Sequence, residues 1–259
     1  MKRINRITLI GWVGAVMMSL TLSACNLKPA EGKTHLTLFI GVDTSGSFRT
    51  SGYYDDSLSF LAHYIYGHLN GLDGLEMPRE LFVGSIGGRG MDEPKAFHPI
   101  HDFQGKDIAQ IEADLRGWFP ATDTLTDFNA FIQQVARISK ERNLILAPIT
   151  VMIVSDGIPD IGPTAAKLDT RDLYKTIDFT PIEFLSKNLT LRLAYASPKV
   201  GDHWRKYISR QRVRLWTVEA EVMKGWSAQV QAGADPAGQV RLWQWVKDNV
   251  DFRVRARTI

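Results

Sequence analysis

Hydroxyl and carboxylate side chains gather in one short stretch, DTSGS, at residues 43–47. Asp43, Ser45 and Ser47 alternate in this stretch, directly after the apolar run LTLFIGV. With a turn at Gly46, their side-chain oxygens can converge on one point above the end of that run. Carboxylate and hydroxyl oxygens suit Mg²⁺, Mn²⁺ or Ca²⁺ rather than a soft metal. The stretch therefore predicts one part of a site for a hard divalent cation.

Two later segments offer oxygens that could complete such a site. Asp156 follows the apolar run ITVMIVS, again where a buried strand is expected to end. Thr126 and Asp127 stand in LTDF, just before the helical pattern FNAFIQQVARI, a place where such side chains normally cap a helix. Thr122 and Thr124, in the preceding ATDT, are competitors of Thr126 for a ligand position.

These segments have to be positioned by the strands and helices around them. Runs of strand length are HLTLFIGV, ELFVGSI, ITVMIVS, LTLRLAYAS and VRLWTVEAEV. Helical patterns are SLSFLAHYIYGHL, DIAQIEADLRGWF, DFNAFIQQVARISKERN, TPIEFLSKN and QVRLWQWVKDNV. Strands that alternate with helices predict an α/β fold with a doubly wound, mostly parallel central sheet flanked by helices on both faces. Ligands of such sheets bind beyond the carboxyl ends of the strands, where Asp43 and Asp156 are expected.

Taken together, these motifs resemble the von Willebrand factor type A domain over about Leu36 to Val250. The resemblance rests on DTSGS, which matches the D-x-S-x-S signature, on the loop threonine in LTDFNAFI, and on the strand-end aspartate in VSDG, all in family order. One departure is that Leu125 precedes the threonine, where the family usually has a glycine. The resemblance implies a Rossmann-like doubly wound fold and a metal-ion-dependent adhesion site.

The resemblance also implies a role for each residue of that site. Ser45, Ser47 and Thr126 would be hydroxyl ligands of Mg²⁺, or of Mn²⁺ or Ca²⁺. Asp43 and Asp156 would hold the ion mostly through bound waters. An acidic side chain of a protein partner would enter as the last ligand, so that the site binds and does not catalyse.

Two alternatives remain open at this stage. The same Ser, Thr and Asp side chains are ordinary capping residues, so a scaffold of this type without a bound ion is the first. A hydrolase that uses Asp43 is the second, because VDTSGS superficially resembles the loop of aspartic proteases. Ser45 stands where those enzymes need glycine, and VSDG is not a second copy of the loop. We therefore expect a binding protein that is not an enzyme.

The N-terminus reads as a bacterial lipoprotein signal. A basic MKRINR, an apolar run and the lipobox-like LSAC predict a signal peptide at 1–24, a lipidated Cys25, a linker over 25–34 and a domain over 35–259. An uncleaved N-terminal anchor with an incidental cysteine is the alternative. Either reading places the domain in the cell envelope, tethered to a membrane. Because Asn26 is not aspartate, the outer membrane is expected if the host is Gram-negative.

Composition limits the remaining functions. The net charge of +3 comes from three basic residues in the predicted signal peptide, and a balanced mature chain gives no reason to expect nucleic acid. From His203 onward Lys and Arg outnumber Asp and Glu by 11 to 5, which leaves open a basic surface near anionic lipid as well as an ordinary solvated face. With a single cysteine, the lipidated chain has no thiol left for a disulfide or a thiolate metal site.

Overall fold

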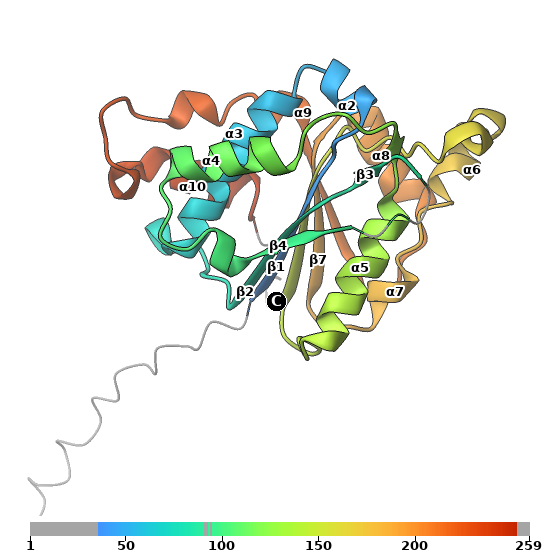
Figure 1. The fold of residues 1–259 in the computed structure, drawn as a ribbon, viewed down its shortest axis with the longest axis horizontal. Coiled ribbons are helices and arrows are strands. Elements are labelled where there is room, and N and C mark those ends of the chain that lie inside the picture. The colour runs from blue at the N-terminus through green and yellow to red at the C-terminus, as the bar shows by residue number, and fades with distance from the viewer. Residues whose placement is uncertain (1–35, 91–92, 94, 253–259) are drawn as a thin grey trace, which may run out of the picture. The chain divides into compact units, whose positions relative to one another are not determined.

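A six-stranded sheet lies between two layers of helices (Figure 1). The structure is a computed structural model that describes residues 36–90, 93 and 95–252. The predicted signal peptide, the linker and Cys25 lie outside the described residues, so those predictions remain untested. Within the described chain no helix is long and apolar enough to cross a membrane.

The order of strands across the sheet is β4-β2-β1-β6-β7-β8. The strands are β1 (Thr37–Val42), β2 (Glu80–Ser85), β3 (Gly87–Gly88), β4 (Phe97–Pro99), β5 (Leu125–Thr126), β6 (Ile149–Val154), β7 (Leu189–Ala196) and β8 (Arg214–Glu219). The α-helices are α2 (Gly46–Thr50), α3 (Tyr54–Leu69), α4 (Ile108–Trp118), α5 (Phe128–Glu141), α6 (Thr170–Tyr174), α7 (Thr180–Glu183), α8 (Pro198–Tyr207), α9 (Ala220–Met223) and α10 (Val240–Asn249). Five 3₁₀ helices, η1 (Leu72–Gly74), η2 (Ile100–Asp102), η3 (Gly162–Lys167), η4 (Ser227–Gln229) and η5 (Pro236–Gly238), complete the described chain. All neighbouring strands of the sheet are parallel except β2 and β4.

Successive side chains of a strand point to opposite faces, and β1 shows how this builds two cores. Leu38 and Ile40 pack with α3, α4 and α10 on one face of the sheet. Phe39 packs on the other face, with α5 and α8. All six residues of β1 are buried, as expected for a central strand covered on both sides. The predicted α/β class, a doubly wound and mostly parallel sheet, is confirmed.

Some element boundaries differ from the prediction. The helix expected over TPIEFLSKN is only one turn long and ends at Glu183. Beyond it the chain leaves the helix and buries Leu185 in the core. The Glu183 carboxylate is buried and accepts hydrogen bonds from the Gln211 amide at 2.8 Å and the Arg212 amide at 2.5 Å. The last predicted strand ends at Glu219, and α9 follows at once.

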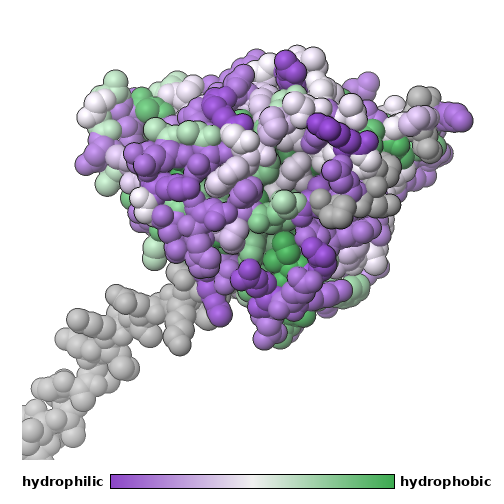
Figure 2. All heavy atoms as spheres, viewed as in Figure 1, coloured by the Kyte–Doolittle hydropathy of each residue, from purple (hydrophilic) through white to green (hydrophobic). Residues whose placement is uncertain are grey.

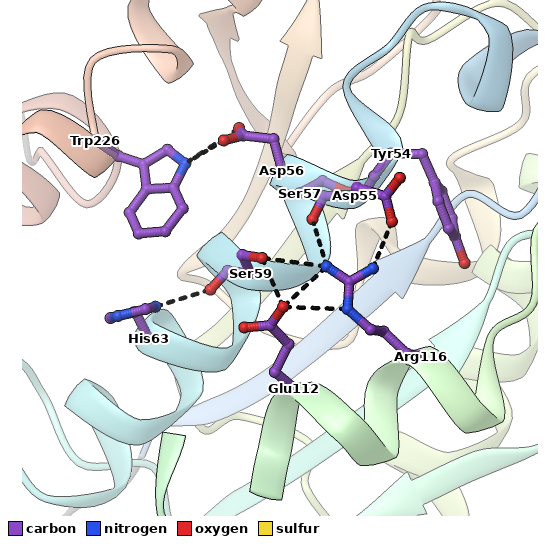
Figure 3. Close-up of polar contacts among 9 residues, drawn as sticks. All are labelled: Tyr54, Asp55, Asp56, Ser57, Ser59, His63, Glu112, Arg116 and Trp226. Carbon is purple, nitrogen blue, oxygen red and sulfur yellow. Dashed lines mark hydrogen bonds and ion pairs between the residues drawn. The ribbon is translucent and has the colours of Figure 1, made fainter. Parts of the chain in front are cut away.

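A polar network joins α3 to α4 (Figure 3). Arg116 on α4 forms an ion pair with Asp55 at the start of α3, and its guanidinium lies 2.8 Å from Glu112 Oε1. Ser59 donates a hydrogen bond to the same Glu112 oxygen at 2.7 Å. The network is partly exposed, and it fixes the helix that follows the DTSGS segment.

A buried charge cluster holds the end of the described chain. His68 Nε2 lies 2.8 Å from Asp251 Oδ2, and His68 Nδ1 lies 2.8 Å from the Glu76 carbonyl oxygen. Tyr64 donates a hydrogen bond to Asp251 at 2.9 Å, and Arg192 Nε lies 3.6 Å from the same carboxylate. With acceptors facing both ring nitrogens, the imidazolium form of His68 is favoured. Burial opposes that charge, but Asp251 outweighs it and raises the pKa of His68.

Candidate metal centre

The candidate centre lies at the carboxyl ends of β1 and β6, the neighbouring strands between which the winding of the sheet reverses. From β1 the chain passes through α3 to β2 on one side, and it later returns through α5 to β6 on the other side. Val42 and Val154 are register partners at the end of these strands, and the Asp43 amide donates a hydrogen bond to the Val154 carbonyl at 3.0 Å. Open α/β sheets bind ligands at such a topological switch point.

Asp43 is completely buried at this switch point. Its Oδ1 accepts a hydrogen bond from the Ser45 amide at 2.9 Å, and its Oδ2 accepts one from the Ser155 hydroxyl at 2.5 Å. Burial raises the pKa of Asp43 to about 6, the Ser155 hydrogen bond lowers it, and the charge of Asp156 raises it further. The carboxylate is thus held rigidly in a place that disfavours its negative charge.

Ser45 and Ser47 point their hydroxyls at one another. Their Oγ atoms are 3.2 Å apart, and Ser45 is the N-cap of α2, with its hydroxyl 3.5 Å from the Phe48 amide. Phe48 is buried and anchors this short helix in the core. Ser45 is buried whereas Ser47 is exposed, so the pair runs from the interior to the surface.

Asp156 lies across from Ser47 at the end of β6. Its Oδ1 accepts a hydrogen bond from the Ile158 amide at 3.0 Å, which forms a tight turn through Gly157 at φ +75°. Burial raises the pKa of Asp156, and hydrogen bonds from the Ile158 amide and the Ser47 hydroxyl oppose that rise. Two carboxylates and two hydroxyls therefore meet at this point, from the loops after β1 and β6.

Thr126 belongs to a third segment that backbone hydrogen bonds tie to the other two loops. Its amide donates to the Asp160 carbonyl at 3.0 Å, in the loop that follows β6. Three residues earlier, the Asp123 carbonyl accepts from the Gly46 amide at 3.1 Å, in the loop that follows β1. Thr126 is fully buried, and its Oγ1 has no hydrogen-bond partner among the described residues. This oxygen is one of four such buried atoms in the described chain, and it is available to a ligand or to a buried water.

The structure separates Thr126 from its two sequence competitors. Thr122 and Thr124 are exposed, whereas Thr126 is at the buried centre of the segment. Asp127, the next residue, caps α5 by accepting a hydrogen bond from the Ala130 amide at 2.9 Å. Of the three threonines, only Thr126 therefore has a buried hydroxyl of the kind an ion could use.

Sequence reasoning missed several residues that support the site. Ser155 was not singled out, although it stands next to Asp156 and binds Asp43. Thr44 donates a hydrogen bond to Asp123 Oδ2 at 2.5 Å, and this pair packs against Gly87. A Cβ atom at Gly87 would lie 2.2 Å from Thr44 Oγ1, so the contact needs glycine. Adjacency to Asp156 was the only sequence signal for Ser155.

These side chains fit a hard divalent cation. Across residues 36–90, 93 and 95–252, no three His, Cys, Asp or Glu side chains gather with metal-binding geometry. A centre made of two carboxylates and three hydroxyls needs no such group. The buried hydroxyl of Thr126 supplies an unused oxygen, and a cation would relieve the mutual repulsion of Asp43 and Asp156.

A pocket of about 310 Å³ opens beside this centre. Its wall includes Arg49 on α2 and Tyr54 on α3, together with Thr122 from the segment before Thr126. The Arg49 side chain is exposed and adds a positive charge next to the exposed Ser47. None of the five candidate ligands lines this pocket, and Asp55 adds an acidic side chain to its wall.

Comparisons with known proteins give a weak likeness of fold. No protein-family model and no curated protein matches this sequence. Solved structures of similar shape include proximal thread matrix protein 1 from the mussel byssus, at 10% identity and a TM-score of 0.42, with 73% of this chain and 46% of that chain covered. They also include the pilus adhesin SpaC from Lactobacillus rhamnosus GG, at 11% identity and a TM-score of 0.46, with 83% of this chain and 30% of that chain covered. The chain thus spans less than half the length of either, and likenesses this remote carry no argument about function.

Proposed function

We propose that this protein is a membrane-anchored lipoprotein of the cell envelope whose domain binds a protein partner through a divalent cation, most simply Mg²⁺. The single observation that carries the proposal is the Thr126 hydroxyl, which is buried and has no hydrogen-bond partner among the described residues, on a segment that backbone hydrogen bonds tie to the loops after β1 and β6. Asp43 and Asp156 follow β1 and β6 at the switch point, the usual ligand position in this class of sheet.

Each side chain has a distinct role in this proposal. Ser45, Ser47 and Thr126 contribute hydroxyl oxygens, while Asp43 and Asp156 hold the ion mostly through bound water. The cation supplies an electrostatic attraction for an acidic side chain of the partner. Ser47 is exposed, so that side of the centre is open to solvent and to a partner.

The alternative is a scaffold without an ion, and the hydrogen bonds of several candidate ligands are consistent with it. Ser45 caps α2, Asp43 binds the Ser45 amide and Asp156 closes a turn, so three of the five residues have structural uses. Capping gives Thr126 no use, because its hydroxyl contacts no amide in the described structure. A hydrolase that attacks through Asp43 is disfavoured, since that carboxylate is buried and bonded at both oxygens.

Metal-dependent capture tests the binding proposal. Wild type, Thr126→Val and Thr124→Val would each be used to capture proteins from cell-envelope extract, once with Mg²⁺ and once with EDTA. We expect one partner that wild type and the exposed-site control Thr124→Val retain only with Mg²⁺, and that Thr126→Val does not retain. A partner held equally well in EDTA would overturn metal-dependent binding. Hydrolytic turnover lost in Asp43→Ala would favour the enzyme instead.

Fractionation tests the anchor separately. If Cys25 carries lipid, wild type is found with membranes and Cys25→Ser is released. Unchanged membrane association of Cys25→Ser would favour an uncleaved N-terminal anchor.

A further inference from the structure

Exposed apolar side chains gather at the amino-terminal edge of the sheet, opposite the candidate metal centre. We call basal edge the loops that lead into β2, β6, β7 and β8, residues 75–79, 142–148, 184–188 and 208–213. Of eight large hydrophobic side chains exposed in the described structure, four are on the basal edge: Met77 at 46%, Ile145 at 40%, Leu146 at 75% and Phe184 at 64%. Such a group on one edge is more than the scattered exposure that is normal for a protein surface.

Within these four loops basic residues outnumber acidic ones, and the one carboxylate known to contact them from outside, in the described part of the chain, is that of the buried Glu183. The four loops, every residue of which is described, contain one acidic residue, Glu76, and five basic ones: Arg79, Arg142, Lys187, Arg210 and Arg212. Four of the five are exposed, and Arg210 is half-buried. The opposite edge of the sheet, by contrast, has the two carboxylates of the candidate metal centre. In Figure 2 green atoms lie among purple ones at the lower end of the molecule, where these loops are found.

The two most exposed apolar residues each have a defined contact, Leu146 through its backbone and Phe184 through its ring. Leu146 has φ +77°, a backbone conformation that bulky residues rarely adopt, and its amide donates a hydrogen bond to the Leu185 carbonyl at 2.9 Å. The Arg212 guanidinium lies 5.3 Å from the centroid of the Phe184 ring. Leu146 and Phe184 are therefore both exposed, and Phe184 lies beside a cation, although burying these side chains would be more favourable in water.

The position of the chain entry indicates what covers the basal edge. β1 starts at Thr37, and its parallel neighbours β2 and β6 start beside it at this same edge. Cys25, the predicted lipid attachment site, precedes Thr37 by twelve residues. Even fully extended, that length spans only about 40 Å. A lipid-tethered domain would thus stay within about 40 Å of the bilayer, and the tether would join it at the basal edge.

We propose that the basal edge rests on an anionic phospholipid surface, with Leu146 and Phe184 inserted among the headgroups. This inference rests on the anchor part of the proposed function and not on the metal centre. Apolar side chains ringed by Lys and Arg are the combination that binds the interface of anionic bilayers. In this orientation the candidate metal centre lies one strand length, about 20 Å, farther from the membrane and faces a partner.

A single fluorescent label can report this contact, because Cys25 is the only cysteine of the chain. In a Cys25→Ser background, Leu146→Cys would be labelled with an environment-sensitive dye and mixed with vesicles of phosphatidylglycerol and phosphatidylcholine. Val222→Cys is the matched control, because Val222 is an exposed apolar residue on α9, which follows the carboxyl end of β8. We expect a blue shift at position 146, none at position 222, and loss of the shift in pure phosphatidylcholine or in high salt.

Further variants separate this inference from its competitors. Arg212→Gln should weaken vesicle binding about fivefold, as expected for one lost cation near an anionic surface. EDTA should change nothing, so the result is independent of whether the metal centre binds a partner. A label at 146 that stays in water on anionic vesicles would overturn the inference. So would a blue shift without vesicles that grows with protein concentration, since that would show a second copy on the basal edge.

Discussion

Replacing Thr126 by valine should change the stability of the domain in opposite directions with and without metal. Valine keeps the shape of threonine but exchanges the hydroxyl for a methyl group. In the ion-free protein this removes a buried oxygen that the described structure leaves without a partner. A buried unsatisfied group costs about 1–3 kcal/mol, so the ion-free variant should be the more stable protein. For a domain of this size, each kcal/mol corresponds to about 2–4 °C in melting temperature.

With metal the order should reverse. A cation at a hundredfold excess over its dissociation constant stabilises the native wild type by about 2.7 kcal/mol, provided that it does not bind the unfolded chain. Thr126→Val lacks one of the proposed ligands and should lose most of this gain. Thermal melts in EDTA and in excess Mg²⁺ or Mn²⁺ measure both effects. Thr124→Val, at an exposed site, is the control and should behave like wild type.

Two results would refute the reasoning. A lower melting temperature of Thr126→Val in EDTA would mean that the hydroxyl has a structural hydrogen bond, for example to a buried water. An undiminished response of this variant to Mg²⁺ would mean that Thr126 is not a ligand. If wild type itself melts at one temperature in all conditions, either the site is empty or its affinity is too low without a partner's carboxylate, and the melt repeated with an acidic peptide separates these two cases.

Three other perturbations test the surrounding structure. The pKa of His68 is raised in the folded protein, so its contribution to stability is complete below the ordinary pKa of histidine and is lost as the pH rises through the folded-state pKa. The pKa of Asp251 is lowered, so its contribution is lost as the pH falls through the folded-state pKa of this carboxyl. Asp251→Asn should therefore lower stability most between these limits, as urea unfolding over a pH series would show. Gly87→Ala should destabilise the domain by about 1–3 kcal/mol, because its Cβ would overlap the Thr44 hydroxyl, and chemical denaturation measures this. Arg116→Ala should cost less than about 1 kcal/mol in the same assay, since its ion pairs are partly exposed.

The sequence predicted the central part of the fold because its signals there are local. β1 and β6 are runs of consecutive apolar residues, and such runs suit strands buried on both faces. β4 and the pairing of β3 with β5 were not predicted. These strands have two or three residues, and only contacts between distant segments fix their partners. The length of α7 was wrong for a similar reason, because Glu183 ends it by bonding a loop far along the chain.

The residues of the candidate site also differ in whether local sequence or only the fold identifies them. Asp43, Ser45 and Ser47 were predicted as ligands because one motif contains them all, and Asp156 because it follows an apolar run. Choosing Thr126 over its neighbours needed only the start of a helix. Ser155 was missed because a serine beside an aspartate is not distinctive in sequence. Its role is visible only in the fold, where it donates a hydrogen bond to Asp43 at the end of the neighbouring strand. Supporting residues of this kind are selected by tertiary distance, which spacing along the chain does not encode.

The energetics of Asp43 explain why an ion-free site would be costly for this domain. Burial raises its pKa from 3.8 to about 6, which corresponds to about 3 kcal/mol against folding once the carboxyl is ionised at neutral pH. The sign follows from the raised value: the native state holds this proton more tightly than the unfolded chain does, so stability falls as pH rises through the shift. Such a cost is a large fraction of the usual 5–15 kcal/mol of a domain. A cation bound there well above its dissociation constant would return about as much, which is the energetic argument for the proposed metal centre.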